Sequence, residues 1–142
     1  METGSIKIIN EEGKAPSVEM QLINNDLWLS SYEIAKTFNC FPQKIEANLR
    51  SIFKNHLLWE NDCTYNHRYT YKGQERQCLY YNLEVLIFLS YRIATFEALI
   101  FRQFLKSALR EHLQKKENKN DTKLFWYFNL NRIKVTVKSI FD

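Results

Sequence analysis

The sequence predicts an α+β fold built mainly as one domain, and three observations support this prediction. The chain has 142 residues, and single domains cluster at about 100–150 residues. Apolar residues make up 45% of the chain and only 3 Gly and 2 Pro are present, which is typical of a packed core rather than of a disordered chain. Segments with the two-residue period of strands alternate with segments that have the 3.6-residue period of helices.

Composition also bounds the functional class. No run of about 18 apolar residues occurs, so we expect no membrane span. The N-terminus lacks an apolar core, so we expect no signal peptide. The cysteines, Cys40, Cys63 and Cys78, are odd in number and form no CxxC pair, which argues against a secreted disulfide framework. We therefore expect a cytoplasmic protein.

Charge is unevenly distributed along the chain. Residues 1–62 carry 6 Lys and Arg against 9 Asp and Glu, and residues 63–142 carry 14 against 7. The formal net charge of +4 is compatible with a nucleic-acid partner but does not identify one.

The N-terminal region predicts β-structure. Ile6, Ile8 and Ile9 precede a turn at residues 11–14, and alternating apolar residues follow at 18–22, which indicates a half-buried hairpin. A second turn at residues 24–26 leads to a short strand at Trp28 and Leu29.

Residues 30–56 predict two helices joined by a tight turn. Ser30 and Glu33 form a capping box, with Leu29 and Ile34 as its hydrophobic staple, so a helix should run from residue 31 to 38. Asn39 tolerates the left-handed backbone conformation that such a turn needs, and Ala35 is small enough to let the second helix cross closely. Pro42 suits the first position of that helix, which we expect to reach His56. Helices separated by about three residues have the spacing of a helix-turn-helix.

The second helix has two different faces. Its apolar side, expected to be buried, consists of Ile45, Leu49, Ile52, Phe53 and His56. Its opposite side is polar or small, and consists of Gln43, Lys44, Ala47, Arg50, Ser51 and Lys54.

The polar side suits the major groove of duplex DNA. Amide side chains contact adenine and arginine contacts guanine, which assigns base contacts to Gln43, Asn48 and Arg50. Phosphates would be neutralised by Lys44 and Lys54. Small side chains at positions 47 and 51 would permit close entry, whereas the carboxylates at 46, 60 and 62 would repel phosphates.

A β-hairpin over residues 65–71 and 76–81, with a turn at 72–75, would form a wing beside the two helices. Arg68, Lys72 and Arg76 lie near its tip and could contact the DNA backbone or minor groove, with Tyr69 and Tyr71 beside them. An ordinary edge hairpin, whose cations discourage aggregation, remains an alternative.

Two long helices should follow. Asn82 would cap a central apolar helix over residues 83–92, and Thr95 would cap a fourth helix that reaches about Lys116. We predict a main domain over residues 1–116 and an extension over 117–142, which is a β-hairpin or an interaction arm.

Catalytic and metal-binding patterns are lacking. The sequence contains no GxSxG, HExxH, GxGxxG or P-loop motif, so we expect no enzyme. His56, Cys63, His67 and Cys78 match no zinc spacing, and we expect no metal and no cofactor.

Taken together, these residues resemble the RhuM-type virulence-associated protein family, whose N-terminal module is related in kind to the DNA-binding domains of phage antirepressors. The resemblance covers residues 5–113. It depends on Trp28-Leu29-Ser30, Ile34-Ala35, Phe38, Ile45, Leu49, Ile52-Phe53, Cys63, Tyr80-Tyr81-Asn82-Leu83, Ser90-Tyr91-Arg92-Ile93, Phe101-Arg102, Phe104 and Leu109. Asn39 stands where the family usually has glycine, and Ala98-Leu99 replaces its usual Gly-Thr. The resemblance implies a DNA-binding regulatory module in which Gln43, Lys44, Ala47, Arg50 and Lys54 line the recognition helix.

We therefore expect an α+β winged helix-turn-helix-like domain that binds double-stranded DNA and regulates transcription of mobile-element or accessory genes. We expect a homodimer that uses the fourth helix and the aromatic segment 124–128. The alternative is a non-catalytic adaptor that binds a protein partner through the same scaffold.

Overall fold

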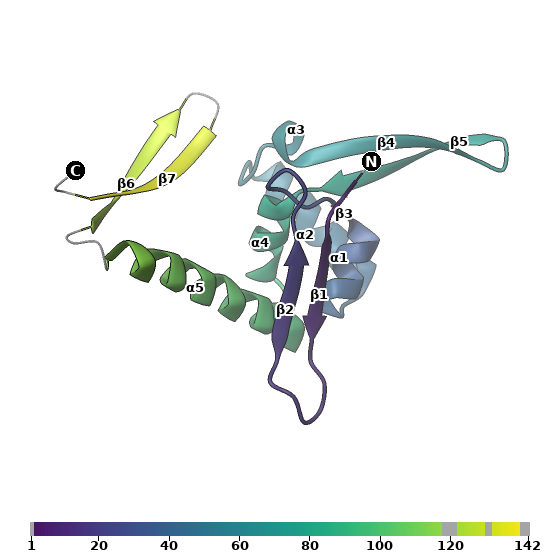
Figure 1. Cartoon of the computed structure of the whole chain (residues 1–142). Helices are drawn as coiled ribbons and strands as arrows, with labels where there is room; N and C mark the ends of the chain where they lie inside the picture. The colour runs from purple at the N-terminus through teal and green to yellow at the C-terminus, as the bar shows by residue number, and fades with distance from the viewer. Residues whose placement is uncertain (1, 118–121, 130–131, 140–142) are drawn as a thin grey trace. The chain divides into compact units, whose positions relative to one another are not determined.

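The computed structural model has an α+β fold and describes residues 2–117, 122–129 and 132–139, with side chains described up to Lys115. The chain divides into two compact units, Met1–Gln103 and Phe104–Asp142 (Figure 1). The division falls within one long helix, inside the range 1–116 that the sequence predicts as one domain. Among the described residues, no helix is long and apolar enough to cross a membrane.

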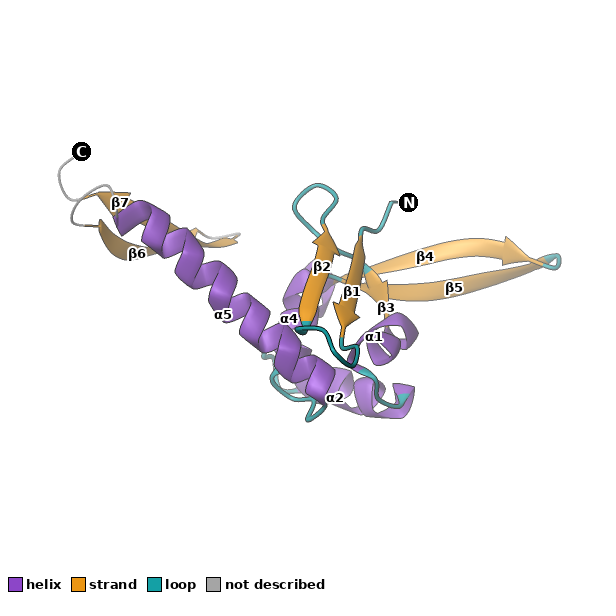
Figure 2. Ribbon diagram, turned by 60° about the horizontal axis from the view of Figure 1, so that its bottom comes forward, coloured by secondary structure: helices purple, strands orange, loops and turns teal. Residues whose placement is uncertain are grey.

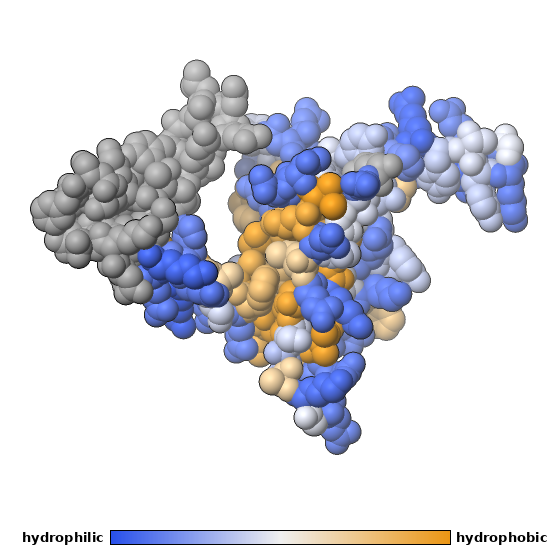
Figure 3. All heavy atoms as spheres, viewed as in Figure 1, coloured by the Kyte–Doolittle hydropathy of each residue, from blue (hydrophilic) through white to orange (hydrophobic). Residues whose placement is uncertain are grey.

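The predicted N-terminal hairpin is confirmed. Strands β1 (Ser5–Ile9) and β2 (Ser17–Gln21) pair antiparallel, with Ile6 opposite Met20 and Ile8 opposite Val18. These four side chains share one face and are half-buried, while the polar residues between them are exposed. In Figure 3 apolar residues gather over β1, β2 and α4 (Leu83–Ser90).

Both helices of the predicted pair form as expected. Helix α1 (Ser31–Phe38) has the complete capping box, in which the Ser30 hydroxyl accepts from the Glu33 amide and the Glu33 carboxylate accepts from the Ser30 amide. Asn39 ends α1 in the left-handed region, at φ 54° and ψ 55°. Helix α2 (Pro42–Lys54) begins at the predicted proline and ends two residues before His56, which itself has a φ of 54°.

A three-stranded antiparallel sheet lies beside the helix pair, with the order β3-β5-β4. The short strand β3 (Leu29–Ser30) pairs with the end of β5 (Gln74–Tyr81), and β4 (Thr64–Tyr71) pairs with β5 along its whole length. A four-residue helix, α3 (Glu60–Cys63), precedes β4 and was not predicted. The tip of the β4–β5 hairpin projects away from the helices of this unit (Figures 1 and 2).

Both helices predicted after this hairpin form, but the first of them is two residues shorter than predicted. Helix α4 spans Leu83–Ser90 rather than residues 83–92. A turn follows it, in which Tyr91 is 62% exposed. The Arg102 guanidinium fixes this turn by donating to the Ser90 and Ile93 carbonyls. Helix α5 (Phe96–Glu117) is long, and Thr95 caps it by accepting from the Ala98 amide, as predicted.

The core of the first unit forms where α1, α2, α4 and the start of α5 bring their apolar faces together. Phe38 and Phe101 are fully buried, with ring centroids 5.8 Å apart. The other fully buried large side chains are Leu27, Ile34, Ile45, Ile52, Val85, Leu86, Leu89 and Ile93. Burial of this many aliphatic side chains fixes the position of α2 relative to the rest of the unit.

In the second unit, α5 is followed by two strands, β6 (Thr122–Asn129) and β7 (Arg132–Ser139), which pair antiparallel as the predicted terminal hairpin. The predicted dimer contact at the aromatic segment 124–128 concerns side chains that lie outside the described part of the chain.

Candidate nucleic-acid interface

Helix α2 is anchored on one face and open on the other. Ile45 and Ile52 are completely buried and Leu49 is 3% exposed, so these three residues anchor the helix in the core. Phe53 is only half-buried, and His56, which was predicted on the buried side, is exposed because the helix ends at Lys54. Five residues of the predicted recognition face are exposed, namely Gln43, Lys44, Ala47, Arg50 and Lys54. Four of them, at positions 43, 47, 50 and 54, follow the three- and four-residue spacing of one helix stripe. We call these four residues, Gln43, Ala47, Arg50 and Lys54, the α2 stripe.

Asn48 and Ser51 lie beside the α2 stripe, half-buried and occupied by hydrogen bonds within the protein. The Asn48 amide group donates to the Lys44 carbonyl at 2.9 Å, and its side-chain carbonyl accepts from Nε of Arg92 at 2.9 Å. The Ser51 hydroxyl accepts from a terminal nitrogen of Arg92 at 3.0 Å. Both side chains therefore bind Arg92 within the protein, and the direct base contact of Asn48 stays a prediction.

Arg92 is a basic residue of this surface that sequence reasoning left out of the site. It lies in the turn after α4 and is exposed, and its neighbour Ile93 is buried at 1% exposure. Its two partners on α2 are neutral, and the structure forms no ion pair to Arg92 within the described residues. The guanidinium is thus held in one orientation beside α2 without a carboxylate to neutralise it, with donors left for an anion. Its position follows from the packing of α4 on α2, which no local sequence signal encodes.

The start of α2 combines apolar and acidic features. Phe41, the N-cap residue, is 80% exposed although it is a large apolar side chain. A shallow hollow of about 340 Å³ is lined by Pro42, Gln43, Glu46 and Arg50. Glu46 is half-buried in this hollow, so one carboxylate lies beside the α2 stripe, as the sequence indicated.

The β4–β5 hairpin separates two arginines that the sequence grouped together. Arg68 pairs with Gln77, whereas Tyr69 pairs with Arg76, and adjacent positions on a strand point to opposite faces. Arg68 and Arg76 therefore lie on opposite faces of the hairpin. Lys72 is at the tip, where it and Gly73 both have positive φ values (51° and 74°), as a two-residue hairpin turn requires.

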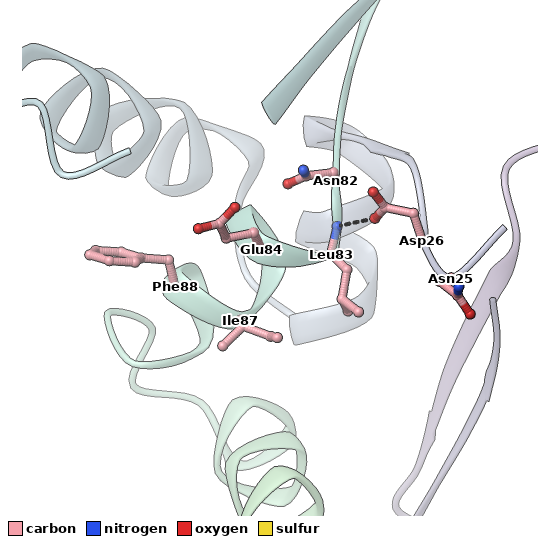
Figure 4. Close-up of a pocket in the computed structure, with 7 residues that line it drawn as sticks. All are labelled: Asn25, Asp26, Asn82, Leu83, Glu84, Ile87 and Phe88. Carbon is pink, nitrogen blue, oxygen red and sulfur yellow. Dashed lines mark hydrogen bonds between the residues drawn. The ribbon is translucent and has the colours of Figure 1, made fainter. Parts of the chain in front are cut away.

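The cysteine and carboxylate groups near α4 serve the fold. Cys63 is buried, and its thiol lies 3.8 Å from a Glu84 carboxylate oxygen; burial, reinforced by that carboxylate, raises the pKa of Cys63 to about 12. Asp26 accepts from the Leu27 and Leu83 amides, which joins the turn before β3 to the start of α4 (Figure 4). The hollow beside this link has a volume of about 350 Å³.

Within the described ranges, no three His, Cys, Asp or Glu side chains gather in a way that could hold a metal ion. Of the four residues considered for zinc, Cys63 is buried against Glu84, whereas His67 and Cys78 are paired across the hairpin.

No family model matches the chain, and neither a curated protein nor a solved structure shows significant similarity to it. The α2 stripe, Arg92 and the β4–β5 hairpin are therefore the features of the molecule that indicate a function.

Proposed function

We propose that the protein binds double-stranded DNA as a winged helix-turn-helix regulator, with α2 as the recognition helix in the major groove. The observation that carries this proposal is the α2 stripe, a line of exposed side chains that includes Arg50 and Lys54, on a helix that is anchored in the core by the buried residues Ile45, Leu49 and Ile52. A helix held in this way presents its side chains as a rigid probe, and the major groove admits an α-helix.

The surrounding elements support the proposal. Helices α1 and α2 are separated by the three residues 39–41, and the order β3-β5-β4 extends into a hairpin with cations near its tip. We assign this arrangement to a winged helix-turn-helix in which Lys72, with Arg76 or Arg68, contacts the DNA backbone. The resemblance to the RhuM-type family is consistent with the same assignment.

Each side chain of the surface has a proposed role. Gln43 and Arg50 would contact bases, and Ala47 would permit close approach. Lys44, Lys54 and Arg92 would neutralise phosphates. Asn48 and Ser51 would act through Arg92, because they hold its guanidinium beside the groove-facing stripe.

We further propose that the regulator acts as a cytoplasmic homodimer on mobile-element or accessory genes. A dimer would bind two half-sites, and the second unit would supply its contact.

Salt-dependent binding to a short random-sequence duplex tests the central claim. Each phosphate contact contributes about 0.9 to the slope of log K against log salt concentration. Arg50→Ala/Lys54→Ala removes one phosphate contact, at Lys54, and one base contact, at Arg50, so it should weaken duplex binding and reduce the magnitude of the slope by about 0.9. The matched control is Lys7→Ala/Lys14→Ala, which removes the same charge from the N-terminal hairpin and should leave the slope almost unchanged. Equal effects of the two pairs would show that only net charge matters and would remove α2 from the interface.

A non-catalytic adaptor function is the second candidate, and exposed apolar residues near α2 favour it. Phe41 is 80% exposed, and Trp59, which follows α2, is 69% exposed beside the exposed Leu57. Acidic residues in α3 would repel DNA from this side. An adaptor would show no duplex binding even at low salt and would lose its protein partner in a Phe41→Ser variant.

A further inference from the structure

The outer face of the β4–β5 hairpin carries a row of aromatic rings outside the α2 interface. We define the aromatic ladder as Trp28, Tyr65, His67, Tyr69 and Tyr80. Along β4, the ring centroids of Tyr65 and His67 are 6.3 Å apart and those of His67 and Tyr69 are 5.9 Å apart, with interplanar angles of 27° and 14°. Trp28 extends the row at 6.4 Å from Tyr65, and Tyr80 joins it at 6.2 Å from His67.

The core does not require these rings. Tyr81 points to the opposite, inner face of the sheet, where it is 7% exposed and stacks on Phe53. By contrast, Tyr65 is 45% exposed and Tyr69 is 42% exposed. Trp28, His67 and Tyr80 are half-buried, so the ladder presents flat aromatic surface to solvent mainly at Tyr65 and Tyr69.

The charges on the outer face are positive. Arg76 lies directly opposite Tyr69, and the Lys72 ammonium lies 5.3 Å from the centroid of the Tyr71 ring. The register places Glu75 opposite Thr70, on the inner face, so the outer-face positions of β4 and β5 include no carboxylate. Near the root of the hairpin, Glu33 is engaged in the capping box of α1.

We propose that the aromatic ladder binds unpaired nucleotides, with the bases stacked on its rings and the phosphates on Arg76 and Lys72. Single-stranded nucleic acid has both chemistries that this face would recognise, namely flat bases and a regularly spaced negative charge. Paired bases inside a duplex are already stacked on one another and do not present their faces, so the ligand of the ladder differs from that of α2. The protein would therefore contact duplex bases through α2 and unpaired bases through the aromatic ladder, with Lys72 and Arg76 as backbone contacts for either ligand.

Fluorescence anisotropy of the full chain with labelled oligo(dT) and oligo(dA) tests this proposal. Tyr65→Ala/Tyr69→Ala should weaken binding to both oligonucleotides by at least about fivefold for each ring removed. Tyr65→Phe/Tyr69→Phe keeps the rings and removes only the hydroxyls, so it should bind like the wild type. Both positions are exposed, and far-UV circular dichroism checks that the variants fold.

Two comparisons separate this proposal from the proposed function. The α2 variant Arg50→Ala/Lys54→Ala should retain oligonucleotide binding, and Tyr65→Ala/Tyr69→Ala should retain duplex binding. Arg76→Gln keeps the ladder intact and should reduce the salt slope for oligo(dT) by about 0.7, which provides a second variant if the alanine pair fails to fold. Oligonucleotide binding that is unaffected by Arg76→Gln, or by loss of both rings, would overturn the proposal. A wild-type chain that binds neither oligonucleotide would also overturn it and would assign the ladder to a protein partner.

Discussion

The role of Arg92 can be tested by changing either its charge or its support. Arg92→Ala removes the cation and frees Asn48 and Ser51, whereas Arg92→Lys keeps the charge but lacks the planar fork that reaches both side chains. Asn48→Ala/Ser51→Ala keeps the guanidinium but removes what orients it. Comparison of the three variants shows whether duplex binding depends on the charge of residue 92, on the orientation of its guanidinium, or on direct DNA contacts by Asn48 and Ser51.

The expected magnitudes follow from the geometry. One lost phosphate contact lowers the salt slope by about 0.9, which changes affinity by about 3.5-fold between 50 and 200 mM salt. Arg92→Lys should retain the slope and lose only a few-fold in affinity. The hydrogen bonds from Arg92 are exposed, so the free energy of unfolding should fall by about 1 kcal/mol or less in any variant.

A double-mutant cycle on duplex binding measures the coupling directly. If Asn48 and Ser51 act through Arg92, Asn48→Ala/Ser51→Ala should weaken duplex binding in the wild type and have almost no effect in the Arg92→Ala background. If Asn48 instead contacts adenine, its effect will persist in that background and will depend on the DNA sequence. A wild-type salt slope for Arg92→Ala would refute the assignment of Arg92 to the interface.

Three further predictions concern the fold. Because the pKa values of Cys63 and Tyr81 are both raised to about 12 in the folded state by burial, the unfolded state releases these protons first as pH rises. The free energy of unfolding should then fall by up to about 1.4 kcal/mol per pH unit for each group, from about pH 9 upward for Cys63 and from about pH 10 upward for Tyr81, and Cys63→Ala should flatten this fall in urea titrations. Asn39→Gly should leave stability nearly unchanged, whereas Asn39→Val should cost about 1–2 kcal/mol, because φ is 54° at this position; equal thermal stability of the two variants would contradict this. Asp26→Ala should lower the free energy of unfolding by about 2 kcal/mol in a urea titration, because two backbone amides lose their acceptor. Asp26→Asn retains an acceptor oxygen, so it should keep most of the wild-type free energy of unfolding in the same measurement.

Local signals predicted the helix pair well. The Ser30 capping box, the left-handed Asn39 and the first-turn Pro42 each involve residues within four positions of one another, so their physics is complete in a short segment. The end of α4 was missed for the opposite reason. The apolar run continues past Ser90, but Arg102, from the next helix, fixes a turn there.

The hairpin shows the same limit. Its strands and turn were predicted, but whether Arg68 or Arg76 shares a face with Tyr69 depends on the register, which a shift of one residue would reverse. The pairing of β3 with β5 joins segments about fifty residues apart and left no local trace.

By itself, the sequence determined where most elements of the first unit lie, which face of α2 is apolar and that the cations gather in the second half of the chain. These properties depend on side-chain period, capping and turn chemistry, which act over a few residues. Only the tertiary structure decided that Arg92 is held on α2 by Asn48 and Ser51 and that the aromatic ladder lies open on the outer face of the sheet. Both depend on contacts between segments that are distant in the chain, and such contacts are set by the packing of the whole core.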